Sequence, residues 1–153
     1  MDTIIIFTAK YFLYISATIA VVFFLRQPRQ KQREILVFAV VVFPLSYLIA
    51  KTASFFYFDP RPFVAGNFTP LIPHAPDNGF PSDHTLLAAA ISAVIFRFNK
   101  KLGIFLFFLA FLVGAARVLA GIHHIVDIAG SVFVVLAVYI FADYFSLWLK
   151  EKK

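Results

Sequence analysis

Cysteine is absent from the 153 residues of this chain, and charged residues make up only 14% of it. The lack of cysteine excludes disulfide bonds and thiolate metal sites. So few charges cannot cover the surface of a soluble domain, whereas 61% of the residues are hydrophobic and 21 are phenylalanine. We therefore expect a single membrane domain over residues 1–153, a length typical of one domain.

Basic residues outnumber acidic ones, 14 against 8, for a formal net charge of +6. Such a balance can indicate nucleic-acid binding when the cations form a stripe. Here they lie between apolar runs, so membrane topology explains them better. We therefore expect the chain to lie among membrane lipids and not to bind nucleic acid.

Apolar runs divide the chain into five expected membrane spans. The runs Ile4 to Leu25 and Ile35 to Phe58 are each long enough to cross a hydrocarbon core of about 30 Å. The run Thr85 to Phe96 is short for a span. The last run, 102–149, would make a helix of about 70 Å, so it must turn once, at the polar stretch 117–124. The expected fold is an all-α bundle of about five transmembrane helices.

The basic residues also predict the orientation of the bundle, because short cytoplasmic loops carry the excess of lysine and arginine. Those expected in the cytoplasm are Arg26, Arg29, Lys31, Arg33, Arg97, Lys100, Lys101, Lys150, Lys152 and Lys153. Lys51, Arg61 and Arg117 then lie at the opposite, outer side. Basic residues beside a span on that side are expected to be functional.

The stretch Gly79 to Thr85 has the pattern of a helix N-terminus, with Ser82 or Asp83 as the N-cap. A helix N-terminus favours anions such as phosphate, and His84 would lie beside that site. The alternative is an ordinary capped helix whose histidine is incidental. The preceding loop, from Asp59 to Pro81, is rich in proline and too long for a simple linker, which is typical of a functional loop.

A second polar group follows at the expected turn. A break near Gly121 would let Arg117 and His123 point into a common pocket. His123 and Asp127 are four residues apart, so we expect them to share a helical face. The carboxylate would accept the Nδ1 proton and leave Nε2 as a nucleophile or base. Several cations on one side repel a metal ion and suit a phosphate, although each residue alone also has an ordinary structural interpretation.

Three motifs carry a resemblance to a known family. They are Lys51…Arg61-Pro62, Pro81-Ser82-Asp83-His84 and Arg117-x5-His123-x3-Asp127. In their order, their common membrane face and the spacing of the third, they resemble the signatures of the type 2 phosphatidic acid phosphatase (PAP2) superfamily of integral-membrane lipid phosphatases. The segment Asp77 to Thr85 is most similar to the BcrC-like undecaprenyl-diphosphatase branch, which recycles the lipid carrier of bacterial cell-wall synthesis.

The resemblance implies a role for each matching residue. His123 would attack the terminal phosphorus, Asp127 would orient it, and His84 would protonate the leaving lipid phosphate and then activate water. The expected phosphate-binding residues are Lys51, Arg61, Ser82, Asp83 and Arg117. No metal or other cofactor is implied. The expected reaction is hydrolysis of undecaprenyl diphosphate through a phosphohistidine, at the outer face of the cytoplasmic membrane.

Alternatives remain for the substrate and for the assembly. Phosphatidic acid or phosphatidylglycerol phosphate could replace the polyprenyl diphosphate. The pocket could also bind a lipid phosphate without cleaving it, although an oriented neutral imidazole argues for catalysis. The family usually has six helices, so the five expected here leave open whether one is lost or a homodimer replaces it.

The chain departs from the family pattern in the first motif, at Asp83 in place of the usual glycine and at Ala116 in place of the serine that often precedes the arginine, and it adds two further histidines. Lys51-x9-Arg61 is longer than the usual Lys-x6-Arg-Pro, so Lys51 must reach from about one helical turn further back. His124 competes with His123 as the nucleophile but lacks the four-residue spacing to the aspartate. His74 is interpreted as a loop residue.

Overall fold

The computed structural model describes residues 1–151, and the regular elements in that part of the chain are helices. They are α1 (Asp2–Leu25), α2 (Arg29–Phe56), α3 (Pro62–Ala65), α4 (Asp83–Phe98), α5 (Lys100–Leu119) and α6 (Ile125–Glu151). The expected all-α fold is confirmed. The loop 59–81 differs from expectation because it contains the short helix α3, where Pro62 supplies a backbone φ suited to the first helical position.

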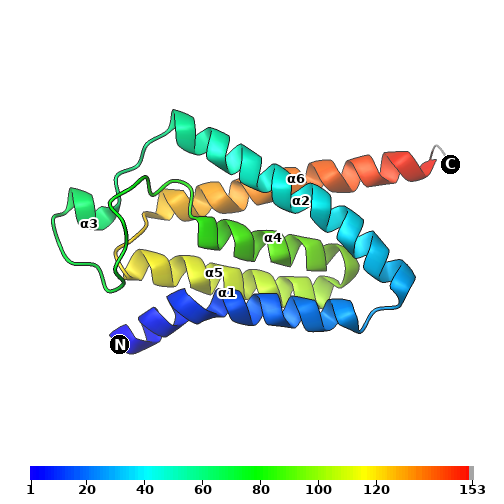
Figure 1. The fold of residues 1–153 in the computed structure, drawn as a ribbon, viewed down its shortest axis with the longest axis horizontal. Coiled ribbons are helices and arrows are strands. Elements are labelled where there is room, and N and C mark those ends of the chain that lie inside the picture. The colour runs from blue at the N-terminus through cyan, green and yellow to red at the C-terminus, as the bar shows by residue number, and fades with distance from the viewer. Residues whose placement is uncertain (152–153) are drawn as a thin grey trace.

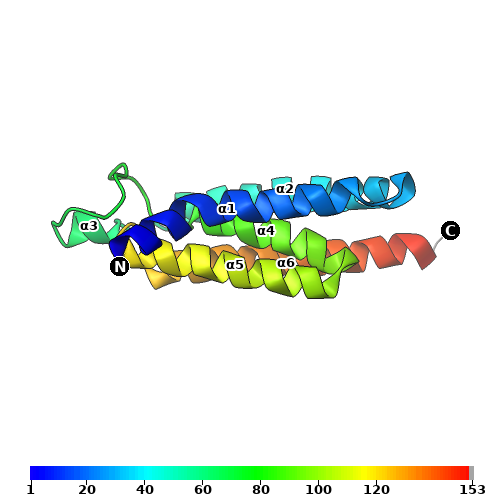
Figure 2. The ribbon, with the colours of Figure 1, turned by 90° about the horizontal axis from the view of Figure 1, so that it is seen from below.

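Four of the described helices, α1, α2, α5 and α6, are long and apolar enough to cross a membrane. The remaining expected span, the third along the chain, corresponds to α4, which has 16 residues. Its length of about 24 Å falls short of a full crossing. Figures 1 and 2 show α4 in the middle of the bundle, where it packs against α1, α2, α5 and α6. The short third run is therefore a central helix that its neighbours shield from lipid.

Polar residues and one glycine set the ends of the central helices. Ser82 is the N-cap of α4, as predicted, and its Oγ accepts the Thr85 backbone N–H at 3.5 Å. Asn99 alone links α4 to α5, and its Oδ1 accepts the Leu102 backbone N–H at 3.0 Å. The predicted turn in the last apolar run is confirmed between α5 and α6, where Gly121 has a φ of 75°.

Small side chains let neighbouring helices approach α4 closely. A Cβ added at Gly103 of α5 would lie 2.3 Å from the Phe96 Cα of α4. In a membrane, apolar side chains gain little by leaving lipid, so close packing of small residues holds helices together. The buried alanines of α4 are Ala88, Ala89, Ala90 and Ala93, whereas large apolar side chains point outward, among them Phe55, Phe108, Phe111, Phe133 and Phe141.

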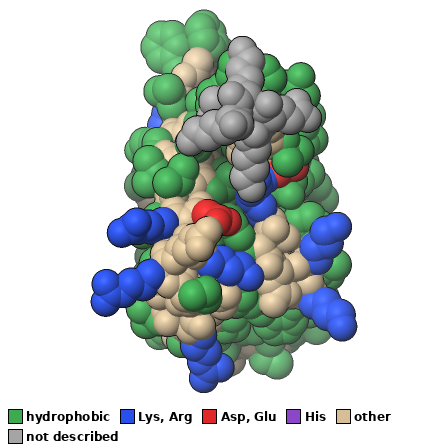
Figure 3. Space-filling view, turned by 90° about the vertical axis from the view of Figure 1, so that its right-hand side faces the viewer, with side chains coloured by type: hydrophobic (Ala, Val, Ile, Leu, Met, Phe, Trp, Pro, Cys, Tyr) green, Lys and Arg blue, Asp and Glu red, His purple; other side chains and the backbone are tan. Residues whose placement is uncertain are grey.

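The two ends of the bundle differ in charge. Figure 1 shows the α1–α2 link, the α4–α5 link and the C-terminal end of α6 together at one end. The first two carry the basic residues of 26–33 and 97–101, which Figure 3 shows in blue, spread over this end. Lys152 and Lys153 lie outside the described residues. The opposite end holds the N-terminus, α3 with its loop, and the α5–α6 link.

Candidate active site

The end opposite the basic links contains a polar cavity of about 250 Å³. It lies where the C-terminal ends of α2 and α5 meet the N-terminus of α4, the α5–α6 link and the loop 59–81. Its lining residues are Lys51, Ser54, Arg61, His74, Asp77, Asn78, Phe80, Pro81, Asp83, His84, Arg117 and His123. The structure thus brings together residues from all three sequence motifs.

His123 and Asp127 form a buried dyad in this region. The Nδ1 atom of His123 lies 3.0 Å from Asp127 Oδ2, and the two side chains are at most 2% exposed. The predicted contact is present, but the expectation that the two side chains share a helical face is wrong. Since α6 begins at Ile125, His123 precedes the helix and shares no helical face with Asp127. Asp127 instead folds back over the helix N-terminus, where its Oδ2 also accepts the His124 backbone N–H at 2.8 Å.

The partners of His123 assign its tautomer. A carboxylate accepts, so Nδ1 carries the proton toward Asp127. Nε2 lies 3.2 Å from Arg61 Nη1, and a guanidinium only donates, so Nε2 presents a lone pair. Burial lowers the pKa of His123 below its usual 6.5, and Arg117 and Arg61 lower it too, while the hydrogen bond that His123 donates to Asp127 raises it. The imidazole is therefore neutral near pH 7, with the lone pair of Nε2 toward Arg61.

Arg61 is only 5% exposed, and its guanidinium group donates hydrogen bonds to several acceptors. Nε donates to Asp77 Oδ1 at 2.7 Å, Nη1 to the Ile122 carbonyl at 2.8 Å and Nη2 to the Asn78 carbonyl at 3.4 Å. Partial burial raises the pKa of Asp77, but the hydrogen bond and charge of Arg61 outweigh it and hold that pKa below its usual range. Arg61 is thus a fixed cation beside the lone pair of His123.

Arg117, at the end of α5, provides a second buried guanidinium. Its Nη2 lies 3.4 Å from His74 Nε2, and its Nε has no hydrogen-bond partner among the described residues. Burial, and then the charge of Arg61, lower the pKa of His74, so this imidazole is also neutral. His84 lines the same cavity from the first turn of α4. The cavity therefore combines two guanidinium groups with three histidines.

The remaining predicted residues lie at the rim or beneath it. Lys51 Nζ is 3.3 Å from both carboxylate oxygens of Asp83, and both side chains are largely exposed. The longer spacing of the first motif therefore still brings Lys51 to the cavity. Ser82 is fully buried, its Oγ is engaged with Thr85, and it is not part of the lining. A direct contact of Ser82 or Asp83 with phosphate stays a prediction.

Sequence reasoning missed several polar residues of the loop. Asn78 is a hub whose Oδ1 accepts the backbone N–H groups of Asp59 and Phe80, while its Nδ2 donates to the Ser54 and Tyr57 carbonyls. His74 and Asp77 line the cavity rather than a remote part of the loop. The density of polar residues between prolines was the available signal, but it could not say which of them face the site.

His124 does not line the polar cavity. Its Nδ1 lies 2.9 Å from Asp59 Oδ2. Asp59, His124 and Asp127 bring a carboxylate or imidazole atom each to within 4.8 Å of one another. Hydrogen bonds to one another and to His123 already occupy most of these atoms. We therefore interpret the group as a hydrogen-bonded cluster and not as metal ligands.

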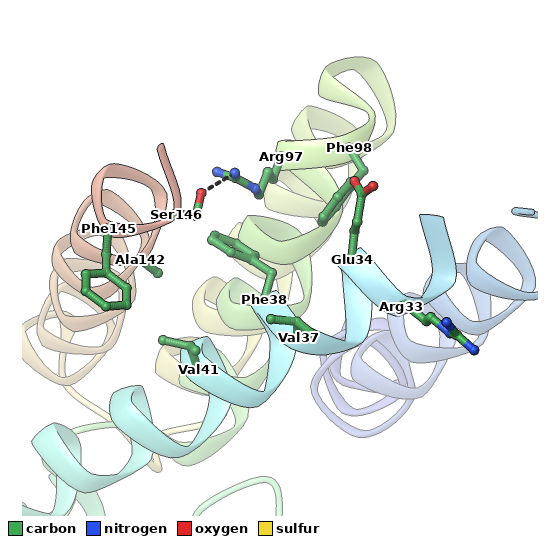
Figure 4. Close-up of a pocket in the computed structure, with 10 residues that line it drawn as sticks. All are labelled: Arg33, Glu34, Val37, Phe38, Val41, Arg97, Phe98, Ala142, Phe145 and Ser146. Carbon is green, nitrogen blue, oxygen red and sulfur yellow. Dashed lines mark hydrogen bonds between the residues drawn. The ribbon is translucent and has the colours of Figure 1, made fainter. Parts of the chain in front are cut away.

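A second cavity, of about 320 Å³, lies at the basic end. Figure 4 shows it between α2, α4 and α6, with Arg97 reaching Ser146. Arg97 also pairs with Asp143 and lies over the Phe38 ring, at 4.6 Å from its centroid. The described residues that line this cavity are mainly apolar and include no histidine. The combination of guanidinium groups and histidines that suits a phosphate is therefore found in the polar cavity at the other end.

Comparison with known proteins agrees with this geometry. Residues 35–150 match the model of the PAP2 superfamily. The undecaprenyl-diphosphatase BcrC of Bacillus subtilis (strain 168) is 37% identical over 142 residues, which cover 90% of this chain and 71% of that protein. The bacitracin transport permease protein BcrC of Bacillus licheniformis is 35% identical over 132 residues. That match covers 86% of this chain but only 64% of the relative, so the chain spans about two thirds of its length.

A solved structure shows the same fold. The first transmembrane PAP2 type phosphatidylglycerolphosphate phosphatase from Bacillus subtilis superposes with a TM-score of 0.69 at 21% identity. The match covers 95% of this chain and 76% of that one. Together with the four apolar helices, this makes the chain a multi-pass membrane protein.

Proposed function

The chain belongs to the PAP2 superfamily, and on that basis we propose that it is an integral-membrane lipid phosphatase that removes the terminal phosphate of a polyprenyl diphosphate. The observation that carries the proposal is the buried His123–Asp127 dyad, whose Nε2 lone pair lies 3.2 Å from Arg61. A site that only bound phosphate would need the cations and no oriented neutral imidazole. The similarity to undecaprenyl-diphosphatase BcrC supports the choice of a polyprenyl diphosphate.

The reaction proceeds in two steps. In the first, the Nε2 lone pair of His123 attacks the terminal phosphorus, and the bond from phosphorus to the bridging oxygen breaks. His84 donates its proton to that oxygen, so that the lipid monophosphate leaves. Asp127 stabilises the positive charge that develops on the imidazole. The product of this step is a phosphohistidine.

In the second step, water releases inorganic phosphate. His84, now neutral, accepts a proton from the water as its oxygen attacks phosphorus and the phosphorus–nitrogen bond breaks. Arg61 and Arg117 donate to the phosphoryl oxygens in both steps, and an incoming oxygen takes over the N–H that Arg61 directs at Nε2. Donors of this kind are typically worth about 10²- to 10³-fold in rate.

The site faces the outer side of the cytoplasmic membrane in this proposal. The described basic links lie together at the other end of the bundle, and short loops rich in lysine and arginine stay in the cytoplasm. A lipid carrier that is released as a diphosphate outside the cell would therefore reach the site directly. Labelling of a cysteine placed in the loop 59–81 by a membrane-impermeant thiol reagent added to intact cells would test this orientation, and a lack of labelling unless the cells are broken open would contradict it.

The decisive experiment is phosphate release by purified protein in detergent with excess EDTA. Undecaprenyl diphosphate, phosphatidylglycerol phosphate and phosphatidic acid are compared by kcat/KM, and the diphosphate is expected to be the best substrate. His123→Ala is expected to abolish turnover, and acid-labile phosphate is expected on His123 of the native chain. Asp143→Asn, a change at the basic end, serves as the control for handling and folding.

Each component of the proposal fails on a different result. Turnover by His123→Ala would overturn the nucleophile, and a requirement for a divalent metal would overturn the chemistry. A higher kcat/KM on either phospholipid would move the substrate to that class and leave the chemistry intact. Binding of all three lipids without release of phosphate would make the chain a lipid-phosphate binding protein.

A further inference from the structure

Asp59 and Arg61 both contact the segment 122–124. They flank Pro60, which forms an antiparallel bridge with Asn78, so this stretch is extended. In extended backbone, residues two apart point to the same side. Arg61 contacts the Ile122 carbonyl and His123 Nε2, whereas Asp59 contacts the next residue, His124. The two side chains therefore contact three consecutive residues, 122–124, and the middle one is the proposed nucleophile.

A continuous chain of hydrogen bonds runs from Asp59 to the nucleophile. Asp59 Oδ2 lies 2.9 Å from His124 Nδ1, and the His124 backbone N–H donates to Asp127 Oδ2 at 2.8 Å. The same oxygen of Asp127 lies 3.0 Å from His123 Nδ1. The other oxygen, Oδ1, is buried without a hydrogen-bond partner among the described residues. The orientation of the Asp127 carboxylate is thus determined by the two donors that contact Oδ2, and the His124 backbone N–H is one of these donors.

Asp59 is itself firmly placed. Its backbone N–H donates to Asn78 Oδ1 at 2.9 Å, and its carbonyl accepts the Gly79 N–H at 2.8 Å. A Cβ added at Gly79 would lie 2.9 Å from Asp127 Oδ2 and 3.2 Å from the Asp59 carbonyl. The backbone at Gly79 therefore packs closely against both Asp59 and Asp127. Because Asp59 is fixed in this way, its contact with the His124 ring can in turn fix the position of the His124 backbone N–H.

We propose that Asp59 and His124 form a positioning pair that aligns Asp127, and through it His123, for attack on phosphorus. The proposal rests on the proposed function, because it assigns a role relative to that nucleophile. Neither residue lines the cavity as described, so neither contacts the substrate. The pair acts through the backbone of His124 and the carboxylate of Asp127.

A positioning role predicts a particular kinetic signature. Loss of the pair leaves Arg61, Arg117 and Lys51 in the cavity, so substrate binding and KM should change by no more than about twofold. Misalignment of a reacting group by about 1 Å can cost about 10²-fold in rate. We therefore expect kcat to fall by about 10- to 100-fold.

The test uses a set of variants in the full chain. His124→Leu removes the ring nitrogen, and His124→Asn keeps an N–H donor near the place of Nδ1. Asp59→Ala removes the acceptor, and Asp59→Ala/His124→Leu removes both partners. Each variant is assayed for kcat and KM on undecaprenyl diphosphate, for the rate of phosphohistidine formation and for thermal unfolding in detergent. His123→Ala in the same series tests the proposed function separately.

The expected results differ from those of a purely structural contact. His124→Leu and Asp59→Ala should each slow phosphohistidine formation by about 10- to 100-fold, the double variant should be no slower than either, and His124→Asn should recover most of the rate. Wild-type kcat in His124→Leu would overturn the inference, as would losses that multiply in the double variant. A loss in every variant that follows the melting temperature, with no recovery in His124→Asn, would also overturn it. Activity in His123→Ala would instead overturn the proposed function.

Discussion

Replacing Asp127 by asparagine separates the charge of the dyad from its geometry. Asp127 Oδ2 accepts two donors, His123 Nδ1–H and the His124 backbone N–H. In Asp127→Asn, the amide must place either its oxygen or its NH2 group at that position. A backbone N–H can only donate, so the His124 N–H at 2.8 Å selects the oxygen. We therefore expect the variant to keep the same His123 tautomer, with Nε2 unprotonated.

The magnitude follows from the loss of charge alone. A hydrogen bond to a charged group is worth about 1.5–3 kcal/mol, and a neutral one about 0.5–1.5 kcal/mol. The difference of roughly 1–1.5 kcal/mol corresponds to about 5- to 15-fold in rate. The positive charge that develops on His123 during attack enlarges this loss, so we expect kcat to fall by about 10- to 100-fold. Asp127→Ala leaves two buried donors unpaired and should cost about 10³-fold or more.

The assay is the initial rate of phosphate release, with 15N chemical shifts of the His123 ring as a direct measure of the tautomer. Where an amide does reverse the tautomer of a catalytic histidine, losses of about 10⁴-fold are expected. Asp127→Asn as slow as Asp127→Ala, with a proton on Nε2, would refute the argument that the backbone N–H selects the oxygen. An unchanged kcat would refute the role of the charge.

Two further predictions concern Arg61 and the acid limb of the pH profile. Arg61→Lys keeps one charge but cannot reach Asp77, the Ile122 carbonyl and His123 together, so kcat/KM should fall by about 10²-fold, while near-native activity would contradict the role of the guanidinium geometry. Burial, Arg117 and Arg61 lower the pKa of His123, and the hydrogen bond to Asp127 offsets only part of this effect. The neutral form of His123, the proposed nucleophile, should therefore persist below pH 6.5. Activity should then be lost only as pH falls through that lowered pKa, and a pH profile of kcat/KM whose acid limb lies above 6.5 would contradict this.

Features governed by local rules could be predicted from the sequence. Span lengths follow from hydropathy, and the turn near Gly121 follows from the length of the last apolar run. Ser82 is the N-cap of α4 because a small hydroxyl residue precedes an apolar segment there. The residues of the motifs meet in one cavity because each lies at the same end of a span.

Contacts between distant segments could not be predicted. Asp59 and His124 are 65 residues apart, and a lone carboxylate in a loop carries no periodic signal that names its partner. The path of the loop 59–81 depends on hydrogen bonds to Asn78, which is one polar residue among several. The expectation that His123 lies on the last helix is also wrong, because a polar stretch does not define a helix boundary to within two residues.

Because Asn99 alone links them, α4 and α5 form a tight helical hairpin. Their backbones are in contact near that link, since a Cβ at Gly103 would meet the Phe96 main chain. His84 lies in the first turn of α4 and Arg117 in the last turn of α5, both at the end of the pair opposite Asn99. The proposed proton donor and one phosphate-binding guanidinium therefore belong to the same helical hairpin, at the end opposite Asn99. A substitution that alters how α4 packs on α5, such as one at Gly103, would thus be expected to disturb both groups together.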